Sequence, residues 1–317
     1  MKNTLTILLT FVSISLFSQN LMRSETAFLM NGNSFLTSNA VTPIIPVDPP
    51  VSTQIIADHN AVAAFDNIPQ YWIDEVKKMQ LGYVGESHSE GVRIGVQLVE
   101  DSDAKYSVDV TARPAVASSA NLRVFAQFPN NGTSWGNLGE YEWYKNGNAI
   151  SSIRAGITRI NATDNTPMDV FGFGWCWDPN ETADDMPDYV NATKNYIGFC
   201  ADNSYQTKVI FTTGPVDDQN AYGETGWNKY LAYEVIRDSV ANDPTRILFD
   251  FADILCYDDN SQTPTTTTYG ANIYPIITPT NVGNGSYAHM GEAGCLRLGK
   301  AMWWMLARIA GWDGEIE

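Results

Sequence analysis

The residues with the clearest chemical potential lie in one heptapeptide. Residues 85–91 read Gly-Glu-Ser-His-Ser-Glu-Gly and follow a short apolar run, residues 81–84. A strand that ends in glycine and leads into a helix leaves a serine hydroxyl at the carboxyl edge of a sheet. The helix N-terminus favours negative charge developing there. Ser87 is therefore a candidate nucleophile, and the alternative is that its hydroxyl only caps the following helix.

A serine nucleophile needs a base, and near neutral pH a histidine is the natural one. The chain has three histidines, His59, His88 and His289. His88 adjoins Ser87, and neighbours on a turn usually point apart, so we expect His88 to be structural or part of a pocket wall. His289 precedes the last predicted helix, where it can lie over the sheet edge; the alternative for this residue taken alone is a surface or capping role. We therefore predict that Ser87 and His289 meet.

Short apolar segments alternate with amphipathic ones along most of the chain. Strands are predicted at 81–84, 169–174, 208–212 and 246–251, and helices at 68–79, 92–99, 183–199, 227–240 and 292–309. This alternation is typical of a parallel sheet covered by helices on both faces. Ligands of such sheets bind beyond the carboxyl ends of the strands. Two stretches, 101–168 and 258–288, break the alternation and are expected to be long loops.

The charge balance and the N-terminal residues indicate an exported, acidic protein. With 36 acidic and 19 basic residues the net charge is −17, which argues against a nucleic-acid partner because phosphate binding needs a basic face. Residues 1–18 are typical of a secretory signal peptide, with a membrane anchor as the alternative. Residues 19–54 predict a flexible tether. We expect a folded domain over residues 55–317, secreted or periplasmic, with no stable membrane insertion after cleavage.

The four cysteines follow the predicted signal peptide, and their even number permits two disulfides that the sequence cannot pair. Cys176 could be a nucleophile, but a disulfide or a buried thiol is the better interpretation because no histidine is near it in sequence. No spacing indicates a zinc site. The acidic run over residues 178–188 fits no calcium loop. No metal and no cofactor are predicted.

Taken together, the two motifs resemble the SGNH/GDSL hydrolases. Residues 85–91 are similar to the first block of that family, Gly-Asp-Ser-x-Thr/Ser-x-Gly, with Glu86 in place of Asp. Residues 289–294, His-Met-Gly-Glu-Ala-Gly, resemble the last block. Residues 248–254 and 301–312 also resemble secreted bacterial members, and the similarity covers about residues 55–317. The resemblance implies a flavodoxin-like, three-layer α/β fold with long loop insertions. It also implies ester hydrolysis through an acyl-serine, with Ser87 as nucleophile and His289 as base.

The sequence departs from the family pattern in three places. The third block, Gly-x-Asn-Asp, is matched by Gly-Trp-Cys-Trp-Asp at residues 174–178, without the Asn that would complete an oxyanion hole. Ser286 stands where the family has the Asp that orients its histidine, which leaves Asp250, Asp253 and Asp258 as conceivable acids. The glycine of the second block could be Gly132, Gly136 or Gly139. The candidate oxyanion or pocket residues are Gly85, Glu86, His88, Ser89, Gly174, Trp175, Cys176 and Asp178.

The predicted function is that of a secreted serine esterase. It would remove acyl groups, acetyl being the best guess, from an extracellular polysaccharide or oligosaccharide. Aromatic residues near the predicted rim suit the apolar faces of sugars, although core packing is the alternative for them; these are Trp135, Trp143, Tyr144, Trp175 and Trp177. Because the Asn and the Asp are missing, two other functions stay open. One is a non-catalytic carbohydrate-binding protein, and the other a carbohydrate-active enzyme of another reaction type, on the same fold.

Overall fold

A central parallel sheet organises the part of the chain that the computed structural model describes, residues 54–176, 181–216 and 222–315. Its strands form two hydrogen-bonded runs. The order is β3-β4-β2-β7-β8 in one run and β9-β10-β1 in the other. The bounds are β1 Ile55–Ala57, β2 Gln80–Gly85, β3 Val108–Thr111, β4 Leu122–Phe125, β7 Val170–Gly174, β8 Lys208–Val209, β9 Phe211–Thr212 and β10 Ile247–Phe249. Only Ile210 separates β8 from β9, and its N–H donates to the carbonyl of Phe171 on β7.

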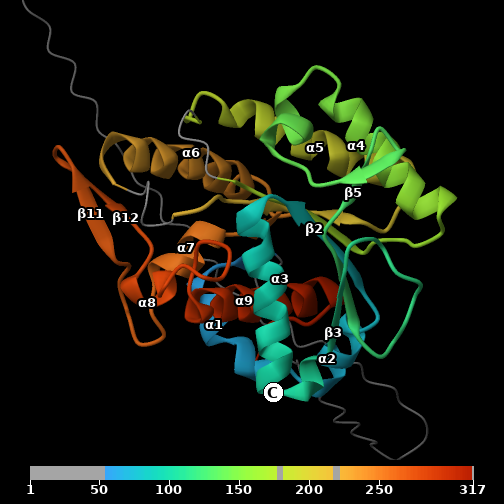
Figure 1. Cartoon of the computed structure of the whole chain (residues 1–317), viewed down its shortest axis with the longest axis horizontal. Helices are drawn as coiled ribbons and strands as arrows, with labels where there is room; N and C mark the ends of the chain where they lie inside the picture. The colour runs from blue at the N-terminus through green and yellow to red at the C-terminus, as the bar shows by residue number, and fades with distance from the viewer. Residues whose placement is uncertain (1–53, 177–180, 217–221, 316–317) are drawn as a thin grey trace, which may run out of the picture. The chain divides into compact units, whose positions relative to one another are not determined.

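The order β4-β2-β7-β8/β9-β10 is the flavodoxin-like order, with all pairs parallel. Helices cover both faces, so the predicted three-layer α/β fold is confirmed (Figure 1). One side carries α1 His59–Ala63, α2 Gln70–Val76, α3 Ser87–Ser102 and α9 Glu292–Ala310. The other carries α4 Ala149–Thr158, α5 Met186–Asp202 and α6 Gly223–Ala241. The short helices α7 Phe251–Cys256 and α8 Pro279–Val282 follow β10 and precede α9 in the chain.

The contact between α3 and α9 is unusually close because glycines face each other across it. A Cβ on Gly95 would lie 2.0 Å from the carbonyl oxygen of Cys295, and a Cβ on Gly299 would lie 2.2 Å from that of Gly95. The helices therefore pack backbone to backbone, which only glycine allows. Since α3 begins at Ser87 and α9 begins three residues after His289, this contact also fixes the relative position of the two predicted site residues.

Several sequence-based element boundaries differ from the structure for local reasons. The helix predicted from Val92 begins at Ser87, immediately after Glu86, whose backbone is extended. The strand predicted to reach Phe251 ends at Phe249, because the Asp250 side chain accepts from the N–H of Asp253 and starts α7. Capping of this kind competes with strand extension.

The prediction that residues 101–168 and 258–288 form long loops was wrong in part, because both stretches contain helices and strands. Residues 101–168 supply the edge strand β3 and its neighbour β4, the hairpin β5 Phe128–Asn130 and β6 Ser134–Gly136, and α4. They also contain the short turns η2 Ala104–Tyr106, η3 Tyr141–Lys145 and η4 Arg159–Thr163; another, η1 Phe65–Asn67, precedes α2. Residues 258–288 contain the hairpin β11 Thr266–Tyr269 and β12 Asn272–Pro275, and α8. Strands of three or four residues are too short to give a clear periodicity.

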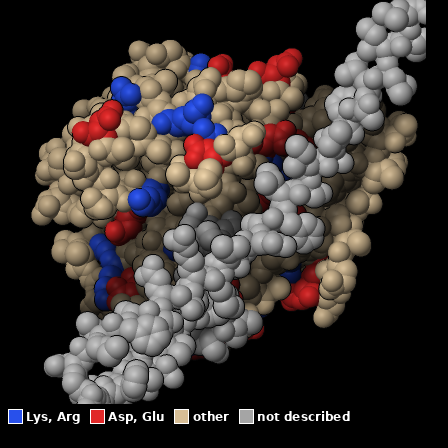
Figure 2. All heavy atoms as spheres, turned by 180° about the vertical axis from the view of Figure 1, so that it is seen from behind, with Lys and Arg blue, Asp and Glu red and all other residues tan. Residues whose placement is uncertain are grey.

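The predicted signal peptide, residues 1–18, and nearly all of the predicted tether, residues 19–54, lie outside the described residues. Over the described ranges, no helix combines the length and apolarity that a bilayer crossing requires. Figure 2 shows the face opposite to that of Figure 1, where acidic and basic side chains lie interspersed among other residues.

Candidate active site

Ser87 stands at the carboxyl end of β2, as the first residue of α3. Gly85 precedes it with φ 152°, and a Cβ on Gly85 would lie 2.1 Å from the carbonyl oxygen of Gly174 on the paired strand β7. Because Ser87 is the first residue of α3, its backbone N–H has no hydrogen-bond acceptor within the helix. The Ser87 hydroxyl contacts two side chains, His289 and Cys176, rather than capping α3.

His289 is presented by a tight turn directly before α9. Tyr287 and Met290 exchange backbone hydrogen bonds of 2.9 Å in both directions, and the two residues between them, Ala288 and His289, have φ of 52° and 72°. Residues other than glycine rarely adopt such positive φ values, and backbone strain of this kind is common at functional sites. The turn places Nε2 of His289 3.0 Å from Oγ of Ser87. The structure thus brings together the two residues that the sequence predicted to meet.

His88 is buried, and its ring lies against the ring of His289. Its ring stacks on the His289 ring with centroids 4.7 Å apart and an interplanar angle of 23°, and it meets the Phe251 ring edge-on at 6.4 Å. The His289 imidazole, which is itself exposed, therefore has one face covered by a fixed ring.

None of the three conceivable acids reaches His289. Asp250 bonds to Arg237 and to Thr213, and Asp258 accepts from the Thr278 hydroxyl at 2.6 Å. Among the described residues, no carboxylate bonds to His289. Ser286, in the place of the family's Asp, is exposed and bonds to Asn284.

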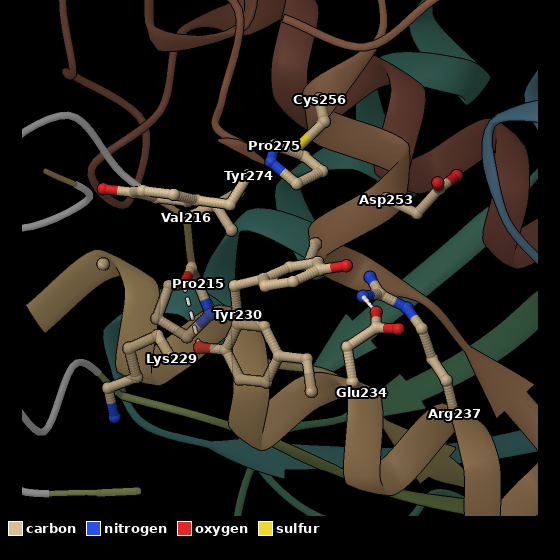
Figure 3. Close-up of a pocket in the computed structure, with 13 residues that line it drawn as sticks. Pro215, Val216, Lys229, Tyr230, Glu234, Arg237, Asp253, Cys256, Tyr274 and Pro275 are labelled. Carbon is tan, nitrogen blue, oxygen red and sulfur yellow. Dashed lines mark hydrogen bonds and ion pairs between the residues drawn. The ribbon is translucent and has the colours of Figure 1, made fainter. Parts of the chain in front are cut away.

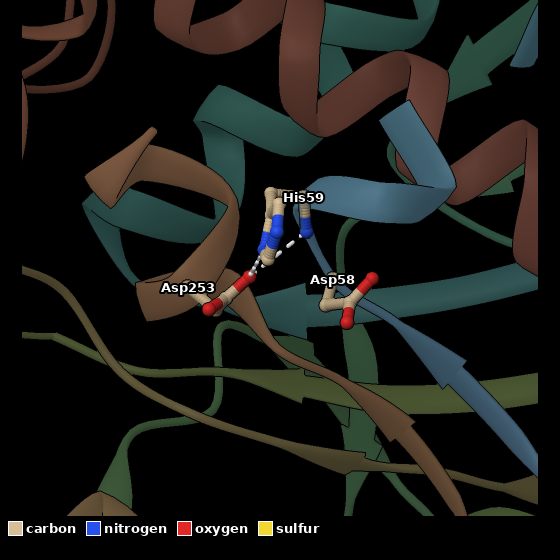
Figure 4. Close-up of side chains that lie close together, drawn as sticks. All are labelled: Asp58, His59 and Asp253. Atoms are coloured by element: carbon tan, nitrogen blue, oxygen red, sulfur yellow. Dashed lines mark hydrogen bonds and ion pairs between the residues drawn. The ribbon is translucent and has the colours of Figure 1, made fainter. Parts of the chain in front are cut away.

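Asp253, the third of these acids, pairs instead with His59, which the sequence analysis had not assigned a role. Oδ1 of Asp253 accepts from the His59 backbone N–H at 2.9 Å and lies 2.6 Å from Nδ1 of its ring (Figure 4). The ring also stacks on Tyr257 at 3.6 Å. Asp58 accepts from the N–H groups of Asn60 and Ala61. The bonds of Asp253 to His59 therefore connect the start of α1 to α7, and Asp58 caps α1.

Cys176 also lies beside the Ser87 hydroxyl, and Glu140 is bonded to Cys176. Sγ of Cys176 lies 3.8 Å from Oγ of Ser87, and the Cys176 backbone N–H donates to Oε1 of Glu140 at 2.7 Å. Burial raises the pKa of Glu140 to about 7, and the charges of Glu181 and Glu86 act in the same direction. Burial and the side chain of Glu86 also raise the pKa of the Cys176 thiol. A thiol that resists ionisation is a poor nucleophile.

Of the three glycines considered for the second block, Gly139 lies at the site. A Cβ on Gly139 would lie 2.8 Å from Oε1 of Glu86, and its N–H donates to Oε2 of Glu142 at 2.9 Å. Gly132 lies beside Ala155 instead, and the Cβ position of Gly136 has no neighbour within 4 Å. Neither Gly139 nor Glu140 could be placed from the sequence, because both precede an irregular turn between short elements.

The other predicted pocket residues are mostly structural. Ser89 is buried; its hydroxyl donates to the Glu86 carbonyl at 2.6 Å and accepts from Arg93. Gly174 leaves room for Ser89, because a Cβ there would lie 2.3 Å from the Ser89 Cβ. Trp175 is 2% exposed, and its ring N–H donates to the carbonyl of Thr212.

Of the two interpretations of the aromatic residues, a sugar-binding rim or core packing, core packing holds for Trp175 and for Trp143, which is fully buried. Their large apolar rings pack in the core instead. Asp178 and Trp177 lie outside the described residues. All four cysteines are free thiols.

No protein-family model matches the sequence, and no curated protein matches it. Among solved structures, the chain is similar to the periplasmic domain of a lipopolysaccharide acetyltransferase from Salmonella ser. Paratyphi A. The TM-score is 0.38 and the sequence identity 15%, over 70% of this chain and 81% of that one.

Proposed function

We propose that the protein is a serine esterase of SGNH type that hydrolyses acyl esters, acetyl esters foremost, on an extracellular carbohydrate. The observation that carries the proposal is the 3.0 Å contact between Oγ of Ser87 and Nε2 of His289 at the carboxyl edge of the sheet. This distance is within the reach that a nucleophile and its base need.

The reaction proceeds in two steps. Ser87 Oγ attacks the ester carbonyl carbon while His289 Nε2 takes the hydroxyl proton. The tetrahedral intermediate collapses, the bond to the alcohol oxygen breaks, and His289 returns the proton to that oxygen. Water then attacks the acyl-serine with His289 again as base, the acid leaves, and Ser87 regains its proton. Both steps need only the two side chains as proton carriers.

Negative charge on the carbonyl oxygen is stabilised mainly by the N-terminus of α3, where the Ser87 N–H is directed to no intrahelical partner. The backbone N–H groups that flank this space, those of Cys176 and Gly139, donate to Glu140 and Glu142. A missing oxyanion donor costs about 3 kcal/mol, or roughly a hundredfold in rate. We therefore expect a slower esterase than one with a complete oxyanion hole.

The stacked pair of histidines substitutes in part for the missing acid. A carboxylate would both orient the base and stabilise its charged form. The His88 ring supplies orientation only, because it covers one face of the His289 ring. Exposure of His289 to water then stabilises the imidazolium that forms during the reaction.

The test is hydrolysis of 4-nitrophenyl acetate and of acetylated polysaccharides by the purified protein and by Ser87→Ala and His289→Gln. We expect each variant to lose at least about 10³-fold in kcat/KM, because paired residues of this kind act as a unit. Ser286→Ala is the matched control, since that exposed side chain bonds to Asn284 rather than to His289, and it should retain full activity. Acetyl transfer to added methanol, measured in the same reactions, separates hydrolysis from transfer to a second alcohol.

Activity that persists in Ser87→Ala would contradict the proposal. So would a folded wild-type protein that hydrolyses neither the aryl ester nor any acetylated glycan. Glycan binding without turnover would instead favour the non-catalytic carbohydrate-binding protein.

A further inference from the structure

A cavity of about 240 Å³ lies at the carboxyl ends of β9 and β10, apart from the Ser87–His289 pair. Its walls come from α6, from α7, from the residues that follow β9 and from β12 (Figure 3). In an open parallel sheet this edge is where ligands bind. The mechanism proposed above uses none of the residues that line it.

The cavity adjoins the candidate active site through α7. Ala252 lines the cavity, and the residue before it, Phe251, meets the His88 ring, which in turn stacks on His289. Only the first turn of a six-residue helix thus separates the two places. A ligand held in the cavity could extend along the same sheet edge toward Ser87.

Aromatic rings form the apolar part of the lining. The rings of Tyr230 and Tyr274 have centroids 6.4 Å apart and are inclined by 31°, and Trp227 stacks on Tyr230 at 5.3 Å. Figure 3 shows Tyr274, Pro275 and Cys256 in one part of the lining and Glu234 and Arg237 in another, with Tyr230 between them. Flat rings beside carboxyl groups match a ligand with apolar faces and a polar edge.

The charges in the lining favour a neutral ligand. Arg237 bonds to Asp250 at 2.7 Å and to Glu234 at 2.7 Å, and Lys229 pairs with the buried Glu181 at 3.1 Å. Each cation is therefore paired with carboxylates of the protein itself, and Glu181 also pairs with Lys145 at 3.1 Å. Asp253 contributes a further carboxylate, whose Oδ1 is engaged by His59. A phosphate or carboxylate ligand would meet acids rather than an available cation.

We propose that this cavity is a binding subsite for one neutral sugar residue of the glycan whose ester reaches Ser87, an inference that rests on the proposed function. The sugar's C–H face lies against the tyrosine rings, and its hydroxyl groups donate to the carboxylates of Glu234 and Asp253. An acyl chain fits less well, because it would desolvate these carboxylates without offering them a donor.

The binding experiment uses the full chain carrying Ser87→Ala, so that turnover does not interfere. Methyl glycosides of glucose, galactose, mannose and N-acetylglucosamine are titrated while tryptophan fluorescence, which includes that of Trp227, is followed. Hexanoate and inorganic phosphate serve as the acyl and anionic probes. We expect saturable binding of at least one glycoside and of neither other probe.

Variants locate the binding in the cavity. Tyr230→Leu, which keeps an apolar side chain but loses the flat ring, should weaken glycoside binding about tenfold. Tyr230→Phe should leave binding within about twofold because it keeps the ring. Tyr269→Leu, on the neighbouring hairpin and outside the cavity lining, is the control and should have no effect. In the active background, Tyr230→Leu should raise KM for the acetylated glycan and leave kcat/KM for 4-nitrophenyl acetate unchanged.

The inference is overturned if no glycoside binds saturably, if Tyr230→Leu and Tyr269→Leu behave alike, or if hexanoate or phosphate binds instead. Thermal unfolding of each variant confirms that loss of binding is not loss of folding. If the glycoside binds through Tyr230 while the wild-type protein hydrolyses no ester, the sugar subsite stands and the esterase proposal fails.

Discussion

Glu140 offers the sharpest test of the site's electrostatics, through the substitution Glu140→Gln. Glu140 as a residue is 8% exposed, and its carboxylate accepts from the Cys176 N–H at 2.7 Å. Burial, with the charges of Glu181 and Glu86, raises its pKa from 4.5 to about 7. Glutamine keeps a carbonyl oxygen to accept the same hydrogen bond but carries no charge, so the variant isolates the cost of the charge.

The magnitude follows from linkage between proton binding and folding. The folded protein holds the Glu140 proton up to about pH 7, whereas the unfolded chain releases it near 4.5. The wild-type protein therefore loses stability as the pH rises between these values, and above pH 7 the full penalty is present. At about 1.36 kcal/mol per pH unit, the gap amounts to about 3 kcal/mol. We expect Glu140→Gln to be more stable than wild type by about 3 kcal/mol near pH 8 and about equal to it near pH 4.

The assay is urea unfolding at both pH values, followed by tryptophan fluorescence. Glu224→Gln removes the same charge from an exposed position on α6 and should change the free energy of unfolding by less than about 0.5 kcal/mol at either pH. A second measurement compares kcat/KM, because a charged Glu140 beside Cys176 opposes the oxyanion. The ratio of variant to wild type should rise with pH. A stability difference that is the same at both pH values would refute this reasoning.

Three further predictions follow from the backbone and from the thiol at the site. Gly299→Ala places a Cβ against the Gly95 carbonyl and should destabilise the folded protein by about 3 kcal/mol. The control, Gly198→Ala at an exposed helical position, should stabilise it by about 1 kcal/mol. Chemical unfolding measures both, and equal effects would contradict the close contact between α3 and α9. Ala288→Gly relieves a side chain at φ 52° and should stabilise by about 0.5 kcal/mol in the same assay, where a loss would argue against strain. Cys176→Ser should retain esterase activity within about threefold, because the raised pKa makes that thiol a poor nucleophile; abolished turnover of the aryl ester would transfer the chemistry to Cys176.

The layered sheet could be predicted from the sequence because its inner strands are buried on both faces. Residues 81–84 and 170–174 carry no charged or amide side chain, and β2 and β7 are indeed fully buried. The edge strand β3 and its neighbour β4 could not be predicted, because Asp109 and Arg123 interrupt their short apolar runs. The meeting of Ser87 and His289 was predictable for a related reason. One follows an inner strand, the other precedes the closing helix, and parallel strands end at a common edge.

The sequence by itself determined the wound α/β sheet and the position of Ser87 at its edge, since local patterning encodes both. It placed His289 before the closing helix, and the packing of α3 against α9 then set the 3.0 Å contact between the two side chains. Tertiary structure alone decided that Asp253 pairs with His59, that Glu140 stands beside Cys176, and that tyrosines on α6 and β12 enclose a cavity. These contacts join segments far apart in the chain. They depend on how the helices pack and which buried polar groups find partners, and no periodicity along the sequence carries that information.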